Sequence, residues 1–176
     1  MEIMNITKTE YGIEGTTWFD LFGREIEVMM DDTVNIEYAN KCVGHLNSFN
    51  HEIIELFCEA AIKYCFEFSD DVGAAIPEIN EKRDVLKYVY PKILIINEPE
   101  DESKVGYHME CNCEWEIEHG LEFTILEDKL LYLGSFNDEA PWQPHEYYKN
   151  ISWNHVFNEP DIFDDQLRDK LSRLLI

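Results

Sequence analysis

The sequence predicts an α+β fold, a single domain over residues 1–176 in which an antiparallel sheet packs against a central helix. Two patterns predict it. Residues 35–68 repeat apolar side chains at helical spacing, whereas residues 105–133 alternate apolar and polar side chains as strands do. With 45% hydrophobic and 13% aromatic residues, the chain can bury one substantial core, so it does not have the composition of a disordered acidic tail.

The first third of the chain is expected to form a hairpin. We predict strands over residues 11–20 and 24–30, joined by a glycine-containing turn at residues 21–23. In the second strand Ile26 and Val28 alternate with glutamates, which is the period of a half-buried strand.

Two helices are predicted next. The first covers residues 36–46 and places Ala39, Val43 and Leu46 on one face. Ser48 or Asn50 can cap the second helix, which continues to about Phe68. Its apolar stripe is too wide for a surface helix, so it is the expected central helix.

The rest of the chain is expected to hold a short helix, a strand, an acidic loop, a three-stranded antiparallel meander and an amphipathic helix. The short helix is predicted at residues 81–89, the strand at 92–96 and the acidic loop at 97–104. The three strands of the meander are predicted at 105–117, 121–125 and 130–133, and the amphipathic helix at 164–175. We expect the aromatic cluster of Trp142, Tyr147, Tyr148 and Trp153 to cover the sheet as a lid.

The strand over residues 105–117 has two faces of different character. One face is apolar: Tyr107, Met109, Cys111, Cys113 and Trp115. The other is polar: His108, Glu110, Asn112, Glu114 and Glu116. Because strand side chains alternate between faces, we expect the polar face to be wet and acidic.

Charge is the strongest pointer to function. The chain has 37 acidic and 14 basic residues, a formal net charge of −23. Such a surface repels nucleic acids and anionic membranes, which we exclude as partners, and attracts basic proteins. Acidic residues dominate between Glu98 and Asp128, where Lys104 is the single basic residue. The candidate partner-binding residues are Glu110, Glu114, Glu116, Glu118 and Glu122.

A metal site and a catalytic site are the alternatives to a partner-binding surface. His108, Cys111, Cys113 and His119 suggest zinc, but His108 lies on the opposite strand face from the cysteines, so we predict buried free thiols, no metal and no cofactor. Glutamates in similar wet settings lack the separated pKa values of a catalytic pair, so we predict no catalytic residues. The alternative is a hydrolase or metal-dependent enzyme that uses His108, His119 and nearby glutamates. A third alternative is a housekeeping domain whose acidity only maintains solubility.

The odd set of five cysteines favours a reducing compartment over a disulfide framework. We find no basic segment followed by an apolar run at the start, and no stretch near the ~20 apolar residues of a membrane span. We therefore expect a cytoplasmic protein.

Several segments resemble an uncharacterised family of small acidic bacterial proteins. They are residues 37–42, 61–65, 113–122, 131–134 and 141–142. The hallmark is a Trp-Glu-x-Glu-His-Gly-Leu-Glu strand pair, matched by residues 115–122, followed by Tyr-x-Gly. The family has no established reaction, but similar acidic domains are often encoded near polymorphic toxin systems. The resemblance thus implies a non-enzymatic immunity protein that neutralises a basic, nuclease-type toxin.

Overall fold

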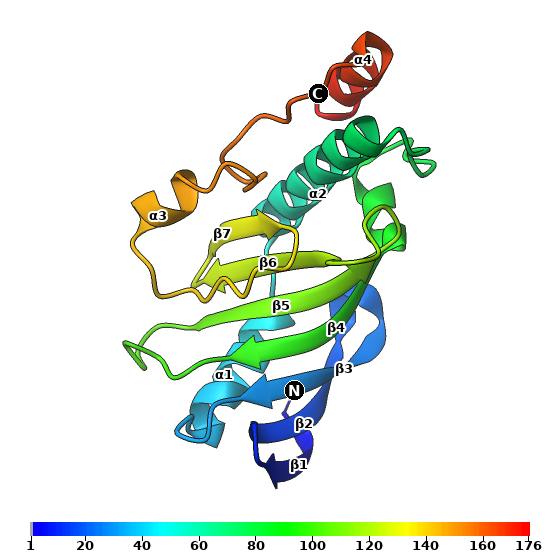
Figure 1. Cartoon of the computed structure of the whole chain (residues 1–176). Helices are drawn as coiled ribbons and strands as arrows, with labels where there is room; N and C mark the ends of the chain where they lie inside the picture. The colour runs from blue at the N-terminus through cyan, green and yellow to red at the C-terminus, as the bar shows by residue number, and fades with distance from the viewer. Residues whose placement is uncertain (1) are drawn as a thin grey trace.

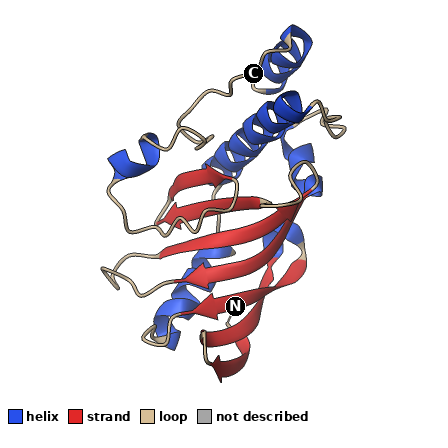
Figure 2. Cartoon of the chain, viewed as in Figure 1, coloured by secondary structure: helices blue, strands red, loops and turns tan. Residues whose placement is uncertain are grey.

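A seven-stranded sheet forms the middle of the structure (Figure 1, Figure 2). The computed structural model describes residues 2–176, so Met1, the first residue of the predicted domain, lies outside the described residues. The strands lie in the sheet in chain order. They are β1 (Met4–Thr9), β2 (Gly12–Phe19), β3 (Arg24–Met30), β4 (Val89–Ile96), β5 (Gly106–Cys113), β6 (Leu121–Leu126) and β7 (Lys129–Gly134).

The sheet is mostly antiparallel, as predicted, with a parallel pairing of β3 and β4. The parallel pair follows from the connection between these strands. A hairpin turn reverses the chain, but two helices lie between β3 and β4 and return it to the same end of the sheet. The expected hairpin, β2 and β3, turns through η1 (Asp20–Phe22) and Gly23, whose φ of 58° suits glycine.

Helices α1 (Ile36–Leu46) and α2 (His51–Val72) share one face of the sheet (Figure 1). The side chain of Asn35 caps α1, and the side chain of Asn50 caps α2 by accepting the backbone N–H of Ile53 at 2.9 Å. Helix α1 contacts β5, where His45 Nδ1 lies 2.9 Å from the Tyr107 hydroxyl. Helix α2 packs along β7. The α+β class is therefore confirmed, with two helices in the helical layer.

The remaining helical elements are short. They are η2 (Lys82–Tyr88), α3 (His145–Lys149) and α4 (Asp165–Leu174). Helix α4 begins at its cap Asp164, close to the predicted start, and packs against α2. Among the described residues, no helix is both long and apolar enough to cross a membrane.

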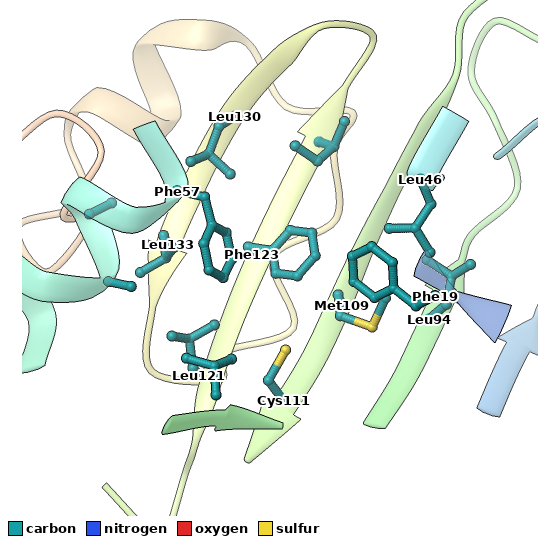
Figure 3. Packing of buried hydrophobic residues seen from close by; sticks show 14 of the residues in the cluster. Phe19, Leu46, Phe57, Leu94, Met109, Cys111, Leu121, Phe123, Leu130 and Leu133 are labelled. Carbon is teal, nitrogen blue, oxygen red and sulfur yellow. The ribbon is translucent and has the colours of Figure 1, made fainter. Parts of the chain in front are cut away.

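The core lies between the sheet and its two main helices (Figure 3). One row of fully buried residues crosses five strands in register: Val28, Leu94, Met109, Phe123 and Leu133. Phe57 of α2 meets Phe123 edge-on, with ring centroids 5.2 Å apart. The predicted apolar face of β5 points into this core. All five cysteines are buried free thiols, which was the prediction for Cys111 and Cys113.

Several elements differ from expectation: α2 ends at Val72 rather than near Phe68, β4 begins at Val89 rather than Lys92, and the helix α3 was not predicted. Strand β1 was not predicted; it is an edge strand that is exposed along most of its length and is held by backbone pairing with β2. Strand β5 ends at Cys113 rather than continuing to Ile117, because residues 114–119 turn away from β4 to begin the connection to β6.

Candidate functional site

The sheet face opposite α1 and α2 divides into two halves. Residues 135–140, here called the strap, follow β7 and fold back over part of this face. The part of β5, β6 and β7 beneath the strap is the covered half. The open half is the same face of β2, β3 and β4, together with the C-terminal end of β5 at Glu110 and Asn112.

Strand register shows that the two halves belong to one continuous face. One cross-strand row runs from Met29 through Ile95, His108 and Thr124 to Tyr132. Met29 and Ile95 are half-buried, whereas the last three residues are fully buried. The boundary between the halves therefore lies at β5.

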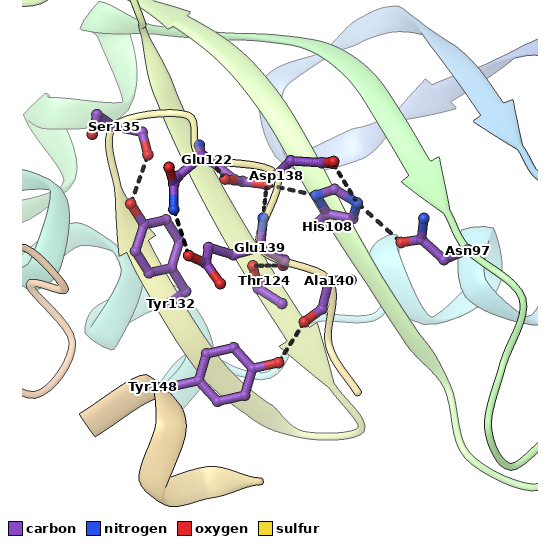
Figure 4. A network of polar contacts seen from close by, with 11 residues as sticks. Asn97, His108, Glu122, Thr124, Tyr132, Ser135, Asp138, Glu139, Ala140 and Tyr148 are labelled. Atoms are coloured by element: carbon purple, nitrogen blue, oxygen red, sulfur yellow. Dashed lines mark hydrogen bonds and ion pairs between the residues drawn. The ribbon is translucent and has the colours of Figure 1, made fainter. Parts of the chain in front are cut away.

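The covered half holds a buried network of polar side chains, in which Glu122 is the common acceptor (Figure 4). Glu122 and His108 are both 0% exposed, and His108 Nδ1 lies 2.6 Å from Glu122 Oε1. The Glu122 carboxylate also accepts the backbone N–H of Asn137 at 2.8 Å and of Glu139 at 3.0 Å. A buried carboxylate needs several donors to offset its desolvation, and the strap supplies two of them.

Other sheet side chains hold the strap at further points. Thr124 Oγ1 donates to the Glu139 carbonyl at 2.7 Å, and the Tyr132 hydroxyl donates to the Ser135 carbonyl at 2.6 Å. Tyr148 of α3 donates to the carbonyl of Ala140. Burial raises the pKa of Tyr132 above the usual range of a phenol, and the negative charge of Glu122 raises it further.

This arrangement corrects the expected wet face. His108 and Glu122 lie on the polar face of their strands, as alternation requires, but the strap excludes water from them. Side-chain alternation assigns a residue to a face; it does not report what covers that face. Part of the expected aromatic lid is present, since Tyr148 is fully buried beside the strap, whereas Tyr147 and Trp153 are exposed.

Glu116 is a second correction, with a different cause. It is 4% exposed, because it turns inward after β5 ends. Its carboxylate accepts the backbone N–H of Glu118 at 2.8 Å and of His119 at 3.0 Å, and lies 2.9 Å from His119 Nδ1. Glu116 therefore closes the turn over residues 114–119 and is not available to a partner.

The other three predicted residues remain accessible in different degrees. Glu110 is half-buried on β5 and forms a 3.1 Å ion pair with Lys92 of β4. Glu114 and Glu118 are exposed, and Glu114 accepts a hydrogen bond from the hydroxyl of Tyr90. The five glutamates thus do not form one surface. Glu110 and Glu114 border the open half, and Glu118 belongs to the turn.

The open half is hollowed in three adjoining places, with volumes of about 370, 320 and 340 Å³. Thr16 and Glu27 line both of the first two hollows, and Met29 and Ile93 link the first with the third. The sequence signal that identifies this face is the alternation in residues 24–30, which places Glu25, Glu27 and Met29 opposite the buried residues.

The residues of the enzyme alternative lie in separate settings. Both ring nitrogens of His108 are engaged, Nδ1 with Glu122 and Nε2 with Asn97 Oδ1 at 3.1 Å. His119 has a 65% exposed side chain and pairs with Glu116. Within residues 2–176, no group of three or more His, Cys, Asp or Glu side chains is placed to hold a metal ion. Burial raises the pKa of Cys113 to about 12, which keeps this thiol protonated.

Comparison with known proteins identifies a family. Residues 3–141 match the family described as Domain of unknown function (DUF6985). This confirms the expected resemblance to an uncharacterised family. No curated protein and no solved structure matches the chain.

Proposed function

This chain belongs to the family described as Domain of unknown function (DUF6985), and we propose that it is a non-enzymatic binding protein whose open half docks a basic protein. The observation that carries the proposal is the charge of the strand side chains on that face. The acidic residues that line the first two hollows are Glu14, Glu25 and Glu27, and the basic residues are Arg24 and Lys92. Complementary charge of this kind accelerates encounter and selects the partner.

Exposed aromatic side chains support the same assignment. Trp18 of β2 is 43% exposed and Tyr90 of β4 is 37% exposed, and both stand among the glutamates of the open half. Large aromatic side chains are the commonest anchors of protein interfaces. Because Tyr90 donates to Glu114, one predicted partner-binding glutamate is held beside such an anchor.

We further propose that the partner is a nuclease-type toxin and that this chain is its immunity protein. A nuclease needs a basic surface to bind phosphates, and an acidic protein can occlude that surface through the same charges. The net charge of −23 supports this pairing. Five buried free thiols support a reducing compartment, so we place the complex in the cytoplasm.

The test is binding to the basic protein encoded by the gene immediately upstream, measured by calorimetry together with inhibition of its nuclease activity. We expect affinity to fall at least about tenfold between about 50 and about 300 mM NaCl, since the attraction is screened. The double variant Glu25→Lys/Glu27→Lys should abolish inhibition.

The matched control is Asp161→Lys/Asp169→Lys, which changes the net charge equally but near α4, on the helical side of the molecule. This variant should still inhibit. Salt-insensitive binding, or equal loss of inhibition in both double variants, would overturn the proposal.

A further inference from the structure

The third hollow lies at the boundary between the open half and the strap, and it combines an apolar floor with aromatic walls. Met29, Ile93 and Ile95 form its floor, and Tyr11 and Phe136 also line it. Its volume is about 340 Å³. Tyr11 comes from the β1–β2 turn and Phe136 from the strap, so segments from opposite ends of the sheet enclose it.

Three carboxylates from three separate elements line the same hollow. Asp31 follows β3, Glu110 is on β5 and Asp138 is on the strap. Glu110 is already paired with Lys92. Asp31 accepts the backbone N–H of Glu98 at 2.8 Å and has no ion-pair partner among residues 2–176. Two carboxylates therefore lack a lysine or arginine partner beside an apolar floor.

We infer that this hollow receives one long basic side chain, a lysine or an arginine, of the protein partner. The inference rests on the proposed function. The aliphatic stem of such a side chain matches the Met29, Ile93 and Ile95 floor, and its charged head matches Asp31 and Asp138. An acidic side chain would be repelled, and an uncharged one would desolvate the carboxylates without compensation.

The hydrogen bonds of the covered half fix the position of the strap, whose Phe136 and Asp138 form one wall of the hollow. The strap is irregular, and its Asn137 and Glu139 N–H groups are held by Glu122. Asp138, which lies between them, adopts a left-handed backbone with φ of 58°, and its Oδ1 is 3.8 Å from His108 Nε2. Glu122 and His108 are thus positioning residues, because they set where Phe136 and Asp138 stand.

The experiment is NMR titration of the intact protein with methyl-labelled Met and Ile residues. The probes are N-acetyl-arginine methylamide, N-acetyl-lysine methylamide and the uncharged N-acetyl-norleucine methylamide. Both basic probes should shift the methyl signals of Met29, Ile93 and Ile95. Ile117, which is 87% exposed on the distant turn, should not move.

Four variants distinguish the residues that contact the basic probe from those that position the strap. Asp138→Asn should weaken the basic probes about two- to fivefold, the range of an exposed ion pair, and Phe136→Ala should reduce the Met29 shift. Glu122→Gln should also weaken them and speed exchange of the Asn137 and Glu139 amide protons. Glu116→Gln is the matched control, since Glu116 also accepts two backbone N–H groups, yet it lies on another turn.

Equal shifts with the norleucine probe, or no shifts with any probe, would overturn the inference. Equal weakening by Glu116→Gln and Glu122→Gln would remove the positioning role. If Glu122→Gln does not fold, Asp138→Asn and Phe136→Ala still decide the binding question, because the Asp138 side chain is 76% exposed and that of Phe136 is half-buried. A protein that inhibits its toxin but ignores the basic probes would refute this inference alone and leave the proposed function standing.

Discussion

Glu122 and Glu116 make the same kinds of contact, but Glu116 binds its own turn whereas Glu122 binds segments distant in the sequence. Each is a buried glutamate that accepts two backbone N–H groups and contacts a histidine. The partners of Glu116 are two and three residues away, and its histidine is 65% exposed. The partners of Glu122 are 14 to 17 residues away, and its histidine is fully buried.

Burial alone therefore does not define the role of a glutamate in this fold. Glu116 accepts backbone N–H groups of its own turn. If its carboxylate is removed, water can enter the turn and accept these hydrogen bonds instead. Glu122 joins β5, β6 and the strap, so its loss leaves donors from three segments without an acceptor in a dry site.

The largest expected effect is that of Glu122→Ala. Removing the carboxylate leaves His108 Nδ1 and the Glu139 N–H without an acceptor in a buried setting, and the Asn137 N–H loses the same partner. We expect the free energy of unfolding to fall by about 3–5 kcal/mol, the cost of breaking a buried pair. Urea denaturation followed by circular dichroism measures it. A loss below about 1 kcal/mol would erase the distinction from Glu116.

Alkaline pH tests the surroundings of both glutamates, because a buried phenol lies near each of them. Burial raises the pKa of Tyr132, with Glu122 adding to the shift; burial also raises that of Tyr64, where Cys113 and then Glu116 add to it. These phenols stay protonated in the folded protein and ionise near pH 10 when it unfolds. The contribution of each phenol to stability should therefore be constant below about pH 10 and fall above it by about 1.4 kcal/mol per pH unit. It adds to the fall that the five buried thiols cause from about pH 9, because burial raises their pKa values as well.

Urea midpoints between pH 8 and 11.5 test this dependence. Tyr132→Phe should remove one phenol's share of the slope. An unchanged slope in that variant would show that Tyr132 does not titrate on unfolding.

A smaller effect is expected for Thr124→Val, which keeps the shape of the side chain and removes one strap contact. The Glu139 carbonyl loses a 2.7 Å hydrogen bond, at a cost of about 1–2 kcal/mol. Thermal unfolding measures the loss. Hydrogen exchange should show it concentrated at the Asn137 and Glu139 amides; uniform exchange along the chain would argue against local pinning.

The smallest effect is expected for Glu116→Gln. The amide retains one acceptor oxygen, and solvent reaches the turn beside the exposed His119. The loss should stay below about 1 kcal/mol in the same urea assay. A loss equal to that of Glu122→Ala would mean that the turn is as essential as the strap.

Much of the fold follows from local patterns in the sequence. The 36–46 helix and the 24–30 strand have the predicted bounds, because capping residues and alternation are local signals. The parallel β3–β4 pair and the edge strand β1 depend on contacts between distant segments, and alternation cannot report them.

The candidate site was only partly predictable for the same reason. The sequence places His108 on the polar face of the predicted 105–117 strand and gives Glu122 as a candidate partner-binding residue. It gave no sign that residues 135–140 would cover them, since the strap has no periodic pattern and is held by side chains from other strands. Glu14, Glu25 and Glu27, which dominate the open half, were overlooked because the charge is densest elsewhere.

The order of strands in the sheet also bears on how the chain folds. Because β1 to β7 are neighbours in both sequence and space, the β1–β3 meander and the β4–β7 meander each form from nearby segments. The β3–β4 pairing alone closes a long loop, which contains α1 and α2. The entropy of closing a loop grows only slowly with its length, and these helices shorten its effective span. The sheet is therefore built from two local meanders that join along the β3–β4 pairing, and the acidic open half spans that junction.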